Sequence, residues 1–427
     1  MIFITWLFDL RREITHFACG GGNELPAYRK AVFNKINILL APTYPILEVN
    51  LSALRHNLQL HQSFLLPSTK TMVMVKANAY GSGSVAVGRF LEKQRVDYLG
   101  VAFVHEGVTL RKAGIQLPIL VLNPAETAFG TMLEFGLEPE IYSLGLLKEF
   151  LSFVKSKKRP SPAAGKFLIH LKLDTGMHRL GFEESDLEKL NALLTANNKT
   201  ITVRSIFSHL AATEAVAHDD FTKNQIAFFN KMYKILAKEL GYCPLRHVLN
   251  SGGIVRFPTF QMDMVRLGIG IYGTGPSGKI QKELQTVNTL KAAVSQIKKI
   301  KKGQTVGYGR AGAAKENMRI ATLNIGYADG LPRKAGNGRF SVLINGQKAP
   351  TFGNVCMDMT MVDISKIKKV RAGDEALIFG KDGFGNELPV SELAQSMETI
   401  PYEIFTSVSA RVKRVYMEGQ SENLEVF

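Results

Sequence analysis

The chain has 427 residues, a length that favours two domains over one. Its formal net charge is +16 at pH 7, but the basic runs at 155–159 and 298–302 are short and contain no aromatic residues, which argues against a nucleic-acid-binding surface. The apolar residues 1–8 are too few to span a bilayer, and Asp9 follows them at once. We therefore expect a protein that binds neither nucleic acid nor a membrane.

The three cysteines, Cys19, Cys243 and Cys356, are far apart in the sequence. This spacing gives neither a disulfide framework nor a pair of metal ligands such as Cys-x-x-Cys. We expect no bound metal, and a reducing compartment, the cytoplasm, is the predicted location.

The first 43 residues fit neither of the two patterns that follow them. A run of three glycines at 20–22 interrupts any regular element in this segment. We treat residues 1–43 as an N-terminal extension without an assigned role. A strand and the start of a helix are predicted at residues 47–54.

Eight short apolar runs follow between residues 72 and 270, each succeeded by a segment with helical spacing or charge. The runs lie at 73–76, 98–102, 119–122, 140–143, 167–173, 205–209, 247–250 and 264–269. Eight strand-and-helix units of about 25 residues each are typical of a (β/α)8 barrel. We predict an α/β fold in which a barrel of this kind occupies residues 44–285.

The sequence changes character after about residue 298. Alternating polar and apolar residues at 319–325 and 341–346 predict strands, and Asn345-Gly346 is a hairpin signal. We predict that a mostly antiparallel β domain occupies residues 286–427.

Reactive polar residues collect at the C-terminal ends of the predicted barrel strands. In chain order they are Lys76, Lys172, Asp174, His209, Asn250, Ser251 and Arg266. In a (β/α)8 barrel this end carries the active site, and a chance distribution would have placed such residues at both ends. A lysine that closes a buried strand lies in a dry site, where desolvation lowers its pKa and favours Schiff-base formation.

Two turns of small residues, 251–253 after the seventh strand and 268–270 after the eighth, complete this pattern. Their backbone amides and the Ser251 hydroxyl predict a phosphate-binding site. Taken singly, each turn is also compatible with a plain loop, and Lys76 with a surface lysine. A Schiff-base lysine together with a phosphate site indicates pyridoxal 5′-phosphate as the cofactor.

Over residues 44–427 the chain resembles the alanine racemases, pyridoxal phosphate enzymes with an N-terminal barrel and a C-terminal β domain. Seven segments carry the resemblance in order, at 75–81, 172–181, 247–251, 265–269, 306–309, 326–330 and 355–358. The resemblance implies interconversion of L-alanine and D-alanine on the cofactor by two-base proton transfer. It also implies a role in supplying D-alanine for peptidoglycan in a bacterial cytoplasm.

The resemblance assigns the two catalytic bases. Lys76 would bind the cofactor as a Schiff base and move the α-proton on one face of the substrate, and Tyr308 would serve the opposite face. Inversion of a stereocentre by proton removal and return requires two such bases. The family takes this tyrosine from the partner subunit, which implies a homodimer with shared active sites.

Further roles follow from the same resemblance. Besides Lys76, the implied cofactor-binding residues are Tyr80, His209, Asn250, Ser251, Arg266, Gly268, Ile269 and Tyr402. The implied substrate-binding residues are Arg179 and Met357, and the supporting residues are Lys172, His247, Tyr327 and Arg333. Lys172 corresponds to a lysine that is carbamylated in many relatives, which would place an anion beside Arg179. Whether Lys172 carries this group is open.

Two positions depart from the family pattern: His178 stands where many relatives have glycine, and Ser82 where many have histidine. Two other functions remain open at this stage. One is a racemase of broader range that also accepts serine, because one methylene in a pocket is worth only about 1–3 kcal/mol. The other is a noncatalytic protein that binds pyridoxal phosphate, against which the presence of a second domain with Tyr308 argues.

Overall fold

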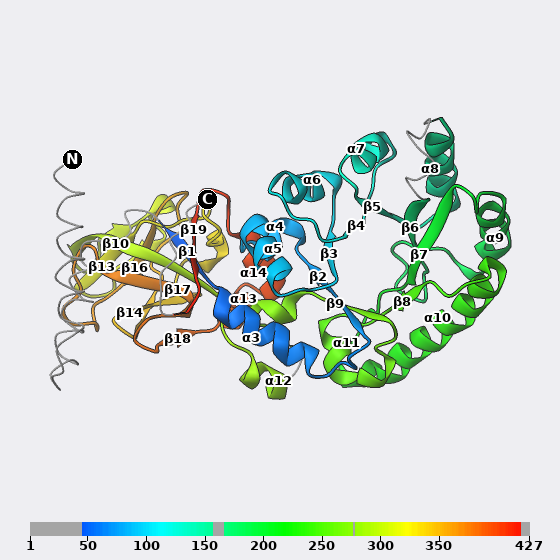
Figure 1. The fold of residues 1–427 in the computed structure, drawn as a ribbon. Coiled ribbons are helices and arrows are strands. Elements are labelled where there is room, and N and C mark those ends of the chain that lie inside the picture. The colour runs from blue at the N-terminus through cyan, green and yellow to red at the C-terminus, as the bar shows by residue number, and fades with distance from the viewer. Residues whose placement is uncertain (1–44, 157–165, 276–277, 420–427) are drawn as a thin grey trace, which may run out of the picture.

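The computed structural model of the protein describes residues 45–156, 166–275 and 278–419. The predicted extension at 1–43 and Cys19 lie outside this part of the chain. Figure 1 shows a barrel of strands and helices beside a second unit made mainly of strands.

The barrel contains all eight strands that the apolar runs predict. They are β2 (Lys70–Met74), β3 (Tyr98–Val101), β4 (Ile119–Val121), β5 (Glu138–Ile141), β6 (Phe167–Lys172), β7 (Ile201–Phe207), β8 (Leu245–His247) and β9 (Met264–Leu267). They form one parallel sheet in the order β8-β7-β6-β5-β4-β3-β2-β9. Val73, Leu99 and Ile141 are completely buried in it, as expected for strands covered on both faces.

The first and last strands of this order, β8 and β9, close the barrel with two backbone hydrogen bonds. The Asp263 N–H donates to the Arg246 carbonyl at 3.2 Å, and the Arg266 N–H donates to the Leu249 carbonyl at 2.9 Å. The predicted (β/α)8 barrel is thereby confirmed, with a short seam between β8 and β9 in place of a continuous ladder.

Helices surround the sheet on its outer side. They are α3 (Leu51–Gln62), α5 (Ser84–Lys93), α6 (Val104–Lys112), α7 (Phe129–Glu134), α8 (Leu144–Ser156), α9 (Leu187–Ala196), α10 (Asp219–Leu240), α11 (Ser251–Arg256) and α12 (Gly278–Glu283). In α10, Ile226, Phe229, Met232 and Leu236 are buried. This spacing of three and four residues gives the helix one apolar face towards the barrel.

The second unit is built on a nine-stranded sheet with the main order β15-β14-β17-β10-β1-β19. Its strands are β10 (Asn288–Ile300), β13 (Met318–Leu323), β14 (Ser341–Ile344), β15 (Gln347–Pro350), β16 (Thr360–Asp363), β17 (Glu375–Lys381), β18 (Glu387–Leu388), β19 (Lys413–Met417) and β1 (Ile46–Asn50). Most pairs are antiparallel. This result confirms the prediction of a β domain. Two short helices, α13 (Val390–Ser396) and α14 (Pro401–Ser407), accompany it, and β11 (Thr305–Val306) pairs with β12 (Gly312–Ala313) separately.

Strand β1 belongs to the second sheet, although it lies at the start of the predicted barrel segment 44–285. It pairs antiparallel with β10 and parallel with β19. From residue 45 the described chain therefore runs through the β domain, enters the barrel through α3, and returns to the same sheet after α12.

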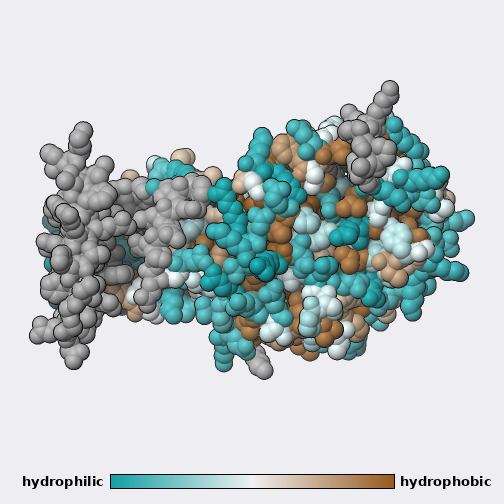
Figure 2. All heavy atoms as spheres, viewed as in Figure 1, coloured by the Kyte–Doolittle hydropathy of each residue, from teal (hydrophilic) through white to brown (hydrophobic). Residues whose placement is uncertain are grey.

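The predicted hairpin at Asn345-Gly346 connects β14 and β15. Both residues have positive φ, 49° and 71°, as a two-residue hairpin turn of this type requires. Figure 2 shows hydrophilic and hydrophobic residues interspersed over the visible face of the barrel. Among the described residues, no helix is both long and apolar enough to cross a membrane.

Candidate active site

Lys76 lies two residues beyond the end of β2 and opens the short element α4 (Lys76–Tyr80). Its four following residues, 77–80, have φ values between 51° and 53°, so this turn is wound left-handed. Such a conformation costs free energy for residues other than glycine. Two side chains hold it: Glu106 accepts the Ala77 N–H at 2.6 Å, and Asn78 accepts the Ser84 N–H at 2.8 Å.

The surroundings of the Lys76 amine lower its pKa, which favours nucleophilic chemistry. Burial and then the positive charges of Arg179 and Lys172 lower its pKa from the ordinary value of 10.5, whereas Glu106 and Glu140 oppose this shift. A lowered pKa increases the fraction of neutral amine, which is the form that attacks a carbonyl.

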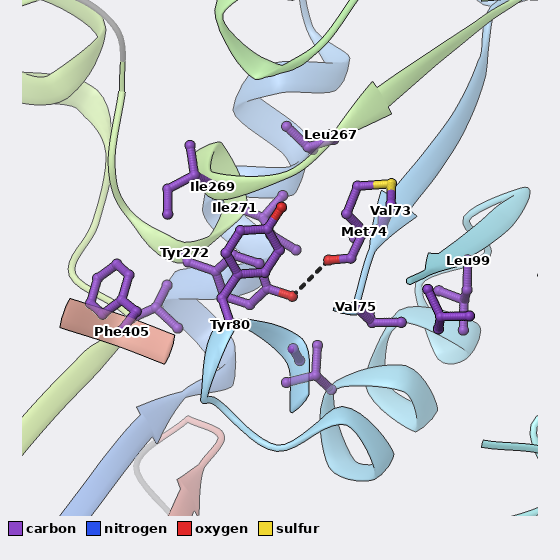
Figure 3. Packing of buried hydrophobic residues seen from close by; sticks show 14 of the residues in the cluster. Val73, Met74, Val75, Tyr80, Leu99, Leu267, Ile269, Ile271, Tyr272 and Phe405 are labelled. Carbon is purple, nitrogen blue, oxygen red and sulfur yellow. Dashed lines mark hydrogen bonds between the residues drawn. The ribbon is translucent and has the colours of Figure 1, made fainter. Parts of the chain in front are cut away.

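Tyr80 ends the left-handed turn and points towards the β8–β9 end of the barrel. Figure 3 shows its ring packed on Tyr272, with 4.8 Å between ring centroids, and the Tyr272 hydroxyl donating to the Met74 carbonyl at 3.0 Å. Tyr402 of α14 lies on another side, with its ring centroid 6.0 Å from that of Tyr80. Burial raises the pKa of both Tyr80 and Tyr402, so both hydroxyls remain protonated donors.

A small polar cup lies around Ser251. Its hydroxyl oxygen accepts the N–H groups of Gly268 at 2.9 Å and Gly270 at 3.2 Å. A β-carbon on Gly268 would lie 2.9 Å from the Tyr80 hydroxyl oxygen and 3.8 Å from the Ser251 oxygen. Both amides are thereby satisfied within the protein, and the Ser251 and Tyr80 hydroxyls face the same space beside Gly268, which leaves two O–H donors for a phosphate group. Asn250 fixes this turn by accepting the Gly253 N–H at 2.9 Å.

Arg266 lies in β9 and is almost completely buried. Its NH1 donates to His247 Nδ1 at 2.6 Å and to the His247 carbonyl at 2.9 Å, and its NH2 donates to the Ser208 and Val248 carbonyls. Burial lowers the pKa of Arg266 to about 10, so the guanidinium is charged at neutral pH. Within the described chain the Nε–H has no acceptor, and it is the donor left for a ring nitrogen of a ligand.

Four side chains, of which His247 is the first, form a series of hydrogen bonds that leads away from Arg266. Its Nε2 lies 2.8 Å from Ser205 Oγ, which lies 2.6 Å from His170 Nδ1, and His170 Nε2 lies 2.6 Å from Glu138 Oε2. Because a guanidinium only donates, every proton in this series of hydrogen bonds points away from Arg266 and towards Glu138. Burial lowers the pKa of His247 well below 6.5, in agreement with a neutral ring.

His209, two residues beyond β7, is the second imidazole at Arg266. Its Nδ1 lies 3.3 Å from Arg266 NH2. Burial and then the charge of Arg266 lower the pKa of His209 well below its usual range. His209 is therefore a neutral ring that could cover a planar ligand held by Arg266.

Lys172 ends β6 and is paired with a carboxylate that the sequence analysis did not select. Its Nζ lies 3.0 Å from Oε1 of Glu140, which is fully buried in β5. The Phe207 ring lies beneath both nearby cations, 5.8 Å from Lys172 Nζ and 5.2 Å from Arg266 Cζ. The site thus joins positive side chains from three strands around one buried acid.

Arg179 lies on an exposed loop after β6. Asp174 stabilises this loop by accepting the N–H groups of Gly176, Met177 and His178 at 2.9–3.1 Å. His178 has a φ of 53°, a left-handed conformation that glycine adopts at less cost. Ser82, the other departure, is buried and donates to Asn288 Oδ1 at 3.0 Å, so it joins the barrel to the β domain.

Five predicted site residues lie in the β domain: Tyr402 of α14 lies beside Tyr80, and the other four are Tyr308, Tyr327, Arg333 and Met357. The side chain of Tyr308 is 72% exposed and that of Met357 is 53% exposed. In the described part of the chain, no hydrogen bond, ion pair or ring contact joins Tyr308 or Met357 to Lys76. One chain therefore brings together the barrel residues of the predicted site, and it leaves these four at the surface of the other unit.

Sequence reasoning missed Glu140, Glu138, His170 and Ser205. Glu140, His170 and Ser205 lie in predicted strands, whereas Glu138 lies two residues before the predicted run at 140–143. The acidic residue at the start of that apolar run was the available signal. The strand pattern does not reveal which strand will lie opposite, so the partners of these residues could not be inferred.

The residues present fit pyridoxal 5′-phosphate. Lys76 offers an amine of lowered pKa, the cup around Ser251 offers donors for a phosphate, and Arg266 offers an unpaired N–H for the ring nitrogen. The phosphate cup depends on Gly268, because a β-carbon there would occupy the space beside the Tyr80 hydroxyl.

Comparison with known proteins gives a consistent result. Residues 49–276 match the alanine racemase N-terminal domain, and residues 287–416 match the alanine racemase C-terminal domain. An alanine racemase of Sorangium cellulosum is 37% identical, over 87% of this chain and 98% of the relative. The structure of alanine racemase from Clostridium difficile 630 has a TM-score of 0.79 at 34% identity, covering 90% of this chain and 97% of that one. That of alanine racemase from Bartonella henselae with covalently bound pyridoxal phosphate has a TM-score of 0.78 at 30% identity, covering 88% and 100%.

A barrel with a Schiff-base lysine and a phosphate cup, followed by a β domain, defines a class of pyridoxal phosphate-dependent enzymes that act on amino acids. Within this class, the matches to the N-terminal and C-terminal domains of alanine racemase identify the family. The chain belongs to the alanine racemase family. It uses pyridoxal phosphate, and its reaction is the interconversion of the enantiomers of alanine, as the sequence predicted.

Proposed function

We propose that Lys76 and Tyr308 are the two bases of this alanine racemase. Bound pyridoxal phosphate supplies an electron sink that makes the α-hydrogen of an attached amino acid acidic. Lys76 exchanges this proton on the face of the substrate that meets β2, and Tyr308 on the opposite face. The half-buried Lys76 that follows β2, with its lowered pKa, is the observation that carries the proposal.

The barrel residues hold the cofactor. We assign phosphate binding to Tyr80, Asn250, Ser251, Gly268, Ile269 and Tyr402, of which Asn250 acts by holding the turn. Arg266 donates to the ring nitrogen through Nε, and His209 covers the ring. Since guanidinium has no proton that it can lose readily, the ring nitrogen stays unprotonated, which limits the electron sink and favours return of the proton.

The substrate carboxylate is assigned to Arg179 and to the backbone amide of Met357. Lys172 supports Arg179, and His247 supports Arg266 through the bond at 2.6 Å. Tyr327 and Arg333 border the entrance. Residues 44–285 thus provide most of the cofactor contacts, and residues 286–427 add Tyr402 and complete the site.

The site is shared between two subunits of a homodimer. Tyr308 and Met357 are exposed in one chain and lack contacts with Lys76, as expected if they serve the partner's barrel. Tyr327 and Met359 add apolar surface that is 43% and 49% exposed and that a second copy would cover. We place the enzyme in the bacterial cytoplasm, where it supplies D-alanine for peptidoglycan.

Optical activity tests the assignment directly. The protein loaded with pyridoxal phosphate is incubated with L-alanine and, separately, with L-serine, and circular dichroism follows each substrate. Loss of the alanine signal much faster than that of serine is the expected result. Comparable rates would assign a racemase of broader range, and no change with either amino acid would leave only cofactor binding.

A Tyr308→Ala variant tests the second base. Hydrogen exchange from solvent into one enantiomer of alanine should fall far more than exchange into the other, because each base serves one face. A Tyr308→Phe variant keeps the ring and removes only the hydroxyl, so it should reproduce the asymmetry. Equal losses for both enantiomers would contradict the two-base assignment.

A further inference from the structure

A cavity of about 620 Å³ lies at the junction between the barrel and the β domain. The first turn of α5 forms its wall on the barrel side, and the segment 410–416, which includes the start of β19, forms the wall on the other side. Figure 1 shows α4 and α5 where the two units meet. None of the residues proposed above to bind cofactor or substrate lines this cavity. Its volume is typical of a site for a small molecule.

The basic residues that line the cavity are Arg411, Lys413 and Arg414, and none of the described residues in its lining is acidic. Arg411 is balanced by two carboxylates outside the lining, Asp329 at 2.6 Å and Asp358 at 2.7 Å. The charge at the cavity surface therefore favours an anionic ligand.

Arg414 is a buried cation that has no carboxylate partner in the described part of the chain. Only 6% of the residue is exposed, and its guanidinium donates to the backbone carbonyls of Gly81, Val408, Ser409 and Val412 at 2.5–3.0 Å. These four bonds leave one N–H group of the guanidinium and do not compensate its charge. A buried charge is costly unless an opposite charge lies nearby. An anion in the cavity would supply that charge.

The first turn of α5 adds donors to the same cavity. The helix begins after Gly83 without a side-chain cap, and the N–H groups of Val85 and Ala86 have no acceptor among the described residues. Ser84 is 9% exposed, and its hydroxyl has no hydrogen-bond partner in the described part of the chain, although the residue lines the cavity. Three donors at the positive end of a helix form an arrangement that suits a phosphate group.

We propose that this cavity is a binding site for a small phosphate ester. Its phosphate group accepts the N–H groups of Val85 and Ala86 and the hydroxyl of Ser84, and it balances the charge of Arg414. An ester fits better than a free phosphate ion, because the cavity has room for an organic part and apolar side chains in its wall, such as Val412.

A ligand in this cavity would lie against groups that hold the left-handed turn after Lys76. Asn78 lines the cavity and accepts the Ser84 N–H at 2.8 Å. Arg414 donates to the Gly81 carbonyl at 3.0 Å, at the end of the same turn. The importance of this link for the reaction rests on the proposed role of Lys76, whereas the binding of the ester does not.

Phosphorus NMR tests the binding with the holoenzyme, in which the cofactor fills its own phosphate site. Phenyl phosphate and, separately, inorganic phosphate are titrated, and broadening of the free ligand's 31P resonance gives each dissociation constant. The resonance of the bound cofactor reports that it stays in place. We expect phenyl phosphate to bind, and to bind more tightly than inorganic phosphate. Equal affinities would overturn the assignment to an ester, and the absence of broadening with both ligands would overturn the site itself.

An Ala86→Asp variant tests the location of the site. It places a carboxylate in the cavity at a helix start, where an acidic residue favours folding, and it should weaken binding of phenyl phosphate about tenfold or more. Ser84→Ala removes one donor only and should weaken binding about fivefold.

Gly145→Asp is the matched control. It introduces the same charge into the first turn of α8, outside the cavity, where a β-carbon meets no atom closer than 3.9 Å. This variant should bind phenyl phosphate as the wild type does. Unchanged binding in Ala86→Asp, or an equal loss in Gly145→Asp, would place the ligand elsewhere and overturn the proposal. Because the titration does not require racemisation, its result is independent of the proposed function.

Discussion

The hydrogen bonds that hold Arg266 can run in only one donor-to-acceptor direction. It donates to His247, which donates to Ser205, which donates to His170, and the last proton points to Glu138. This series of hydrogen bonds ends at the Glu138 carboxylate. It orients both imidazoles with Nε2 as the donor, and it leaves the Arg266 Nε–H for the ligand.

Ser205→Ala removes the hydroxyl in the middle of this series of hydrogen bonds. His247 Nε2–H and His170 Nδ1 would both lose a buried partner, and each such loss costs about 1–3 kcal/mol. We expect the free energy of unfolding to fall by an amount of this order, and the apoenzyme to bind pyridoxal phosphate more weakly in a fluorescence titration. Ser152→Ala, on the exposed side of α8, is the control. Unchanged stability and affinity in Ser205→Ala would show that these hydrogen bonds do not hold Arg266 in place.

Glu140 makes stability depend on pH in a defined direction. Burial, opposed by Lys172, raises its pKa from 4.5 to about 7, so the folded protein binds this proton more tightly than the unfolded chain. Its contribution to stability is fully present below about pH 4.5 and is lost as the pH rises through about 7. The difference is about 3 kcal/mol by linkage.

Urea unfolding of the apoenzyme at pH 5 and pH 8 measures this effect. Glu140→Gln cannot ionise, so its free energy of unfolding should rise relative to that of the wild type between the two values. A difference that is constant with pH would mean that Glu140 does not titrate in this range.

At the scale of elements, the left-handed turn after Lys76 depends on the β domain. Gly81 closes the turn with a φ of 82°, and its carbonyl accepts Arg414 Nε–H at 3.0 Å. A β-carbon on Gly81 would overlap the Phe405 carbonyl of α14. The β domain therefore contacts the segment that carries Lys76, the proposed base, directly.

Gly81→Ala should disturb this contact. The positive φ and the overlap with backbone together should cost more than about 2 kcal/mol in stability, since backbone cannot move aside cheaply. The displaced turn should also weaken cofactor binding, seen as reduced absorbance of bound pyridoxal phosphate. Gly130→Ala in α7 is the control, because a β-carbon there meets nothing within 4 Å. Equal behaviour of the two variants would contradict the close approach of α14.

The sequence was sufficient to predict the barrel and the end of it at which the proposed site residues lie, and the reasons are local. Apolar runs mark buried strands, and the polar residues that follow them must lie at one end of a parallel barrel. The sheet of β1 was not predictable, because its partners β10 and β19 lie far along the chain. The left-handed turn could not be predicted from the sequence either, because the alanines at 77 and 79 have no preference for positive φ.

At the scale of the whole molecule, the two halves of the proposed site lie on different surfaces of one chain. Lys76 is in the barrel, whereas Tyr308 projects from the β domain with 72% of its side chain exposed. If two subunits exchange these residues, each active site takes Lys76 from one chain and Tyr308 from the other. The arrangement makes activity depend on the assembly, because a monomer would contain no complete site.

Heterodimers with defined subunits test this exchange. Co-expression with two different tags yields a dimer of Lys76→Ala and Tyr308→Ala chains, in which one site has both bases and the other has neither. We expect this heterodimer to have about half of the wild-type activity, although each homodimer of the variants is inactive. The reciprocal heterodimer pairs a wild-type chain with a chain that carries both substitutions, and every site in it lacks one base. It should be inactive, whereas sites formed within single chains would give the opposite result, an active second heterodimer and an inactive first one.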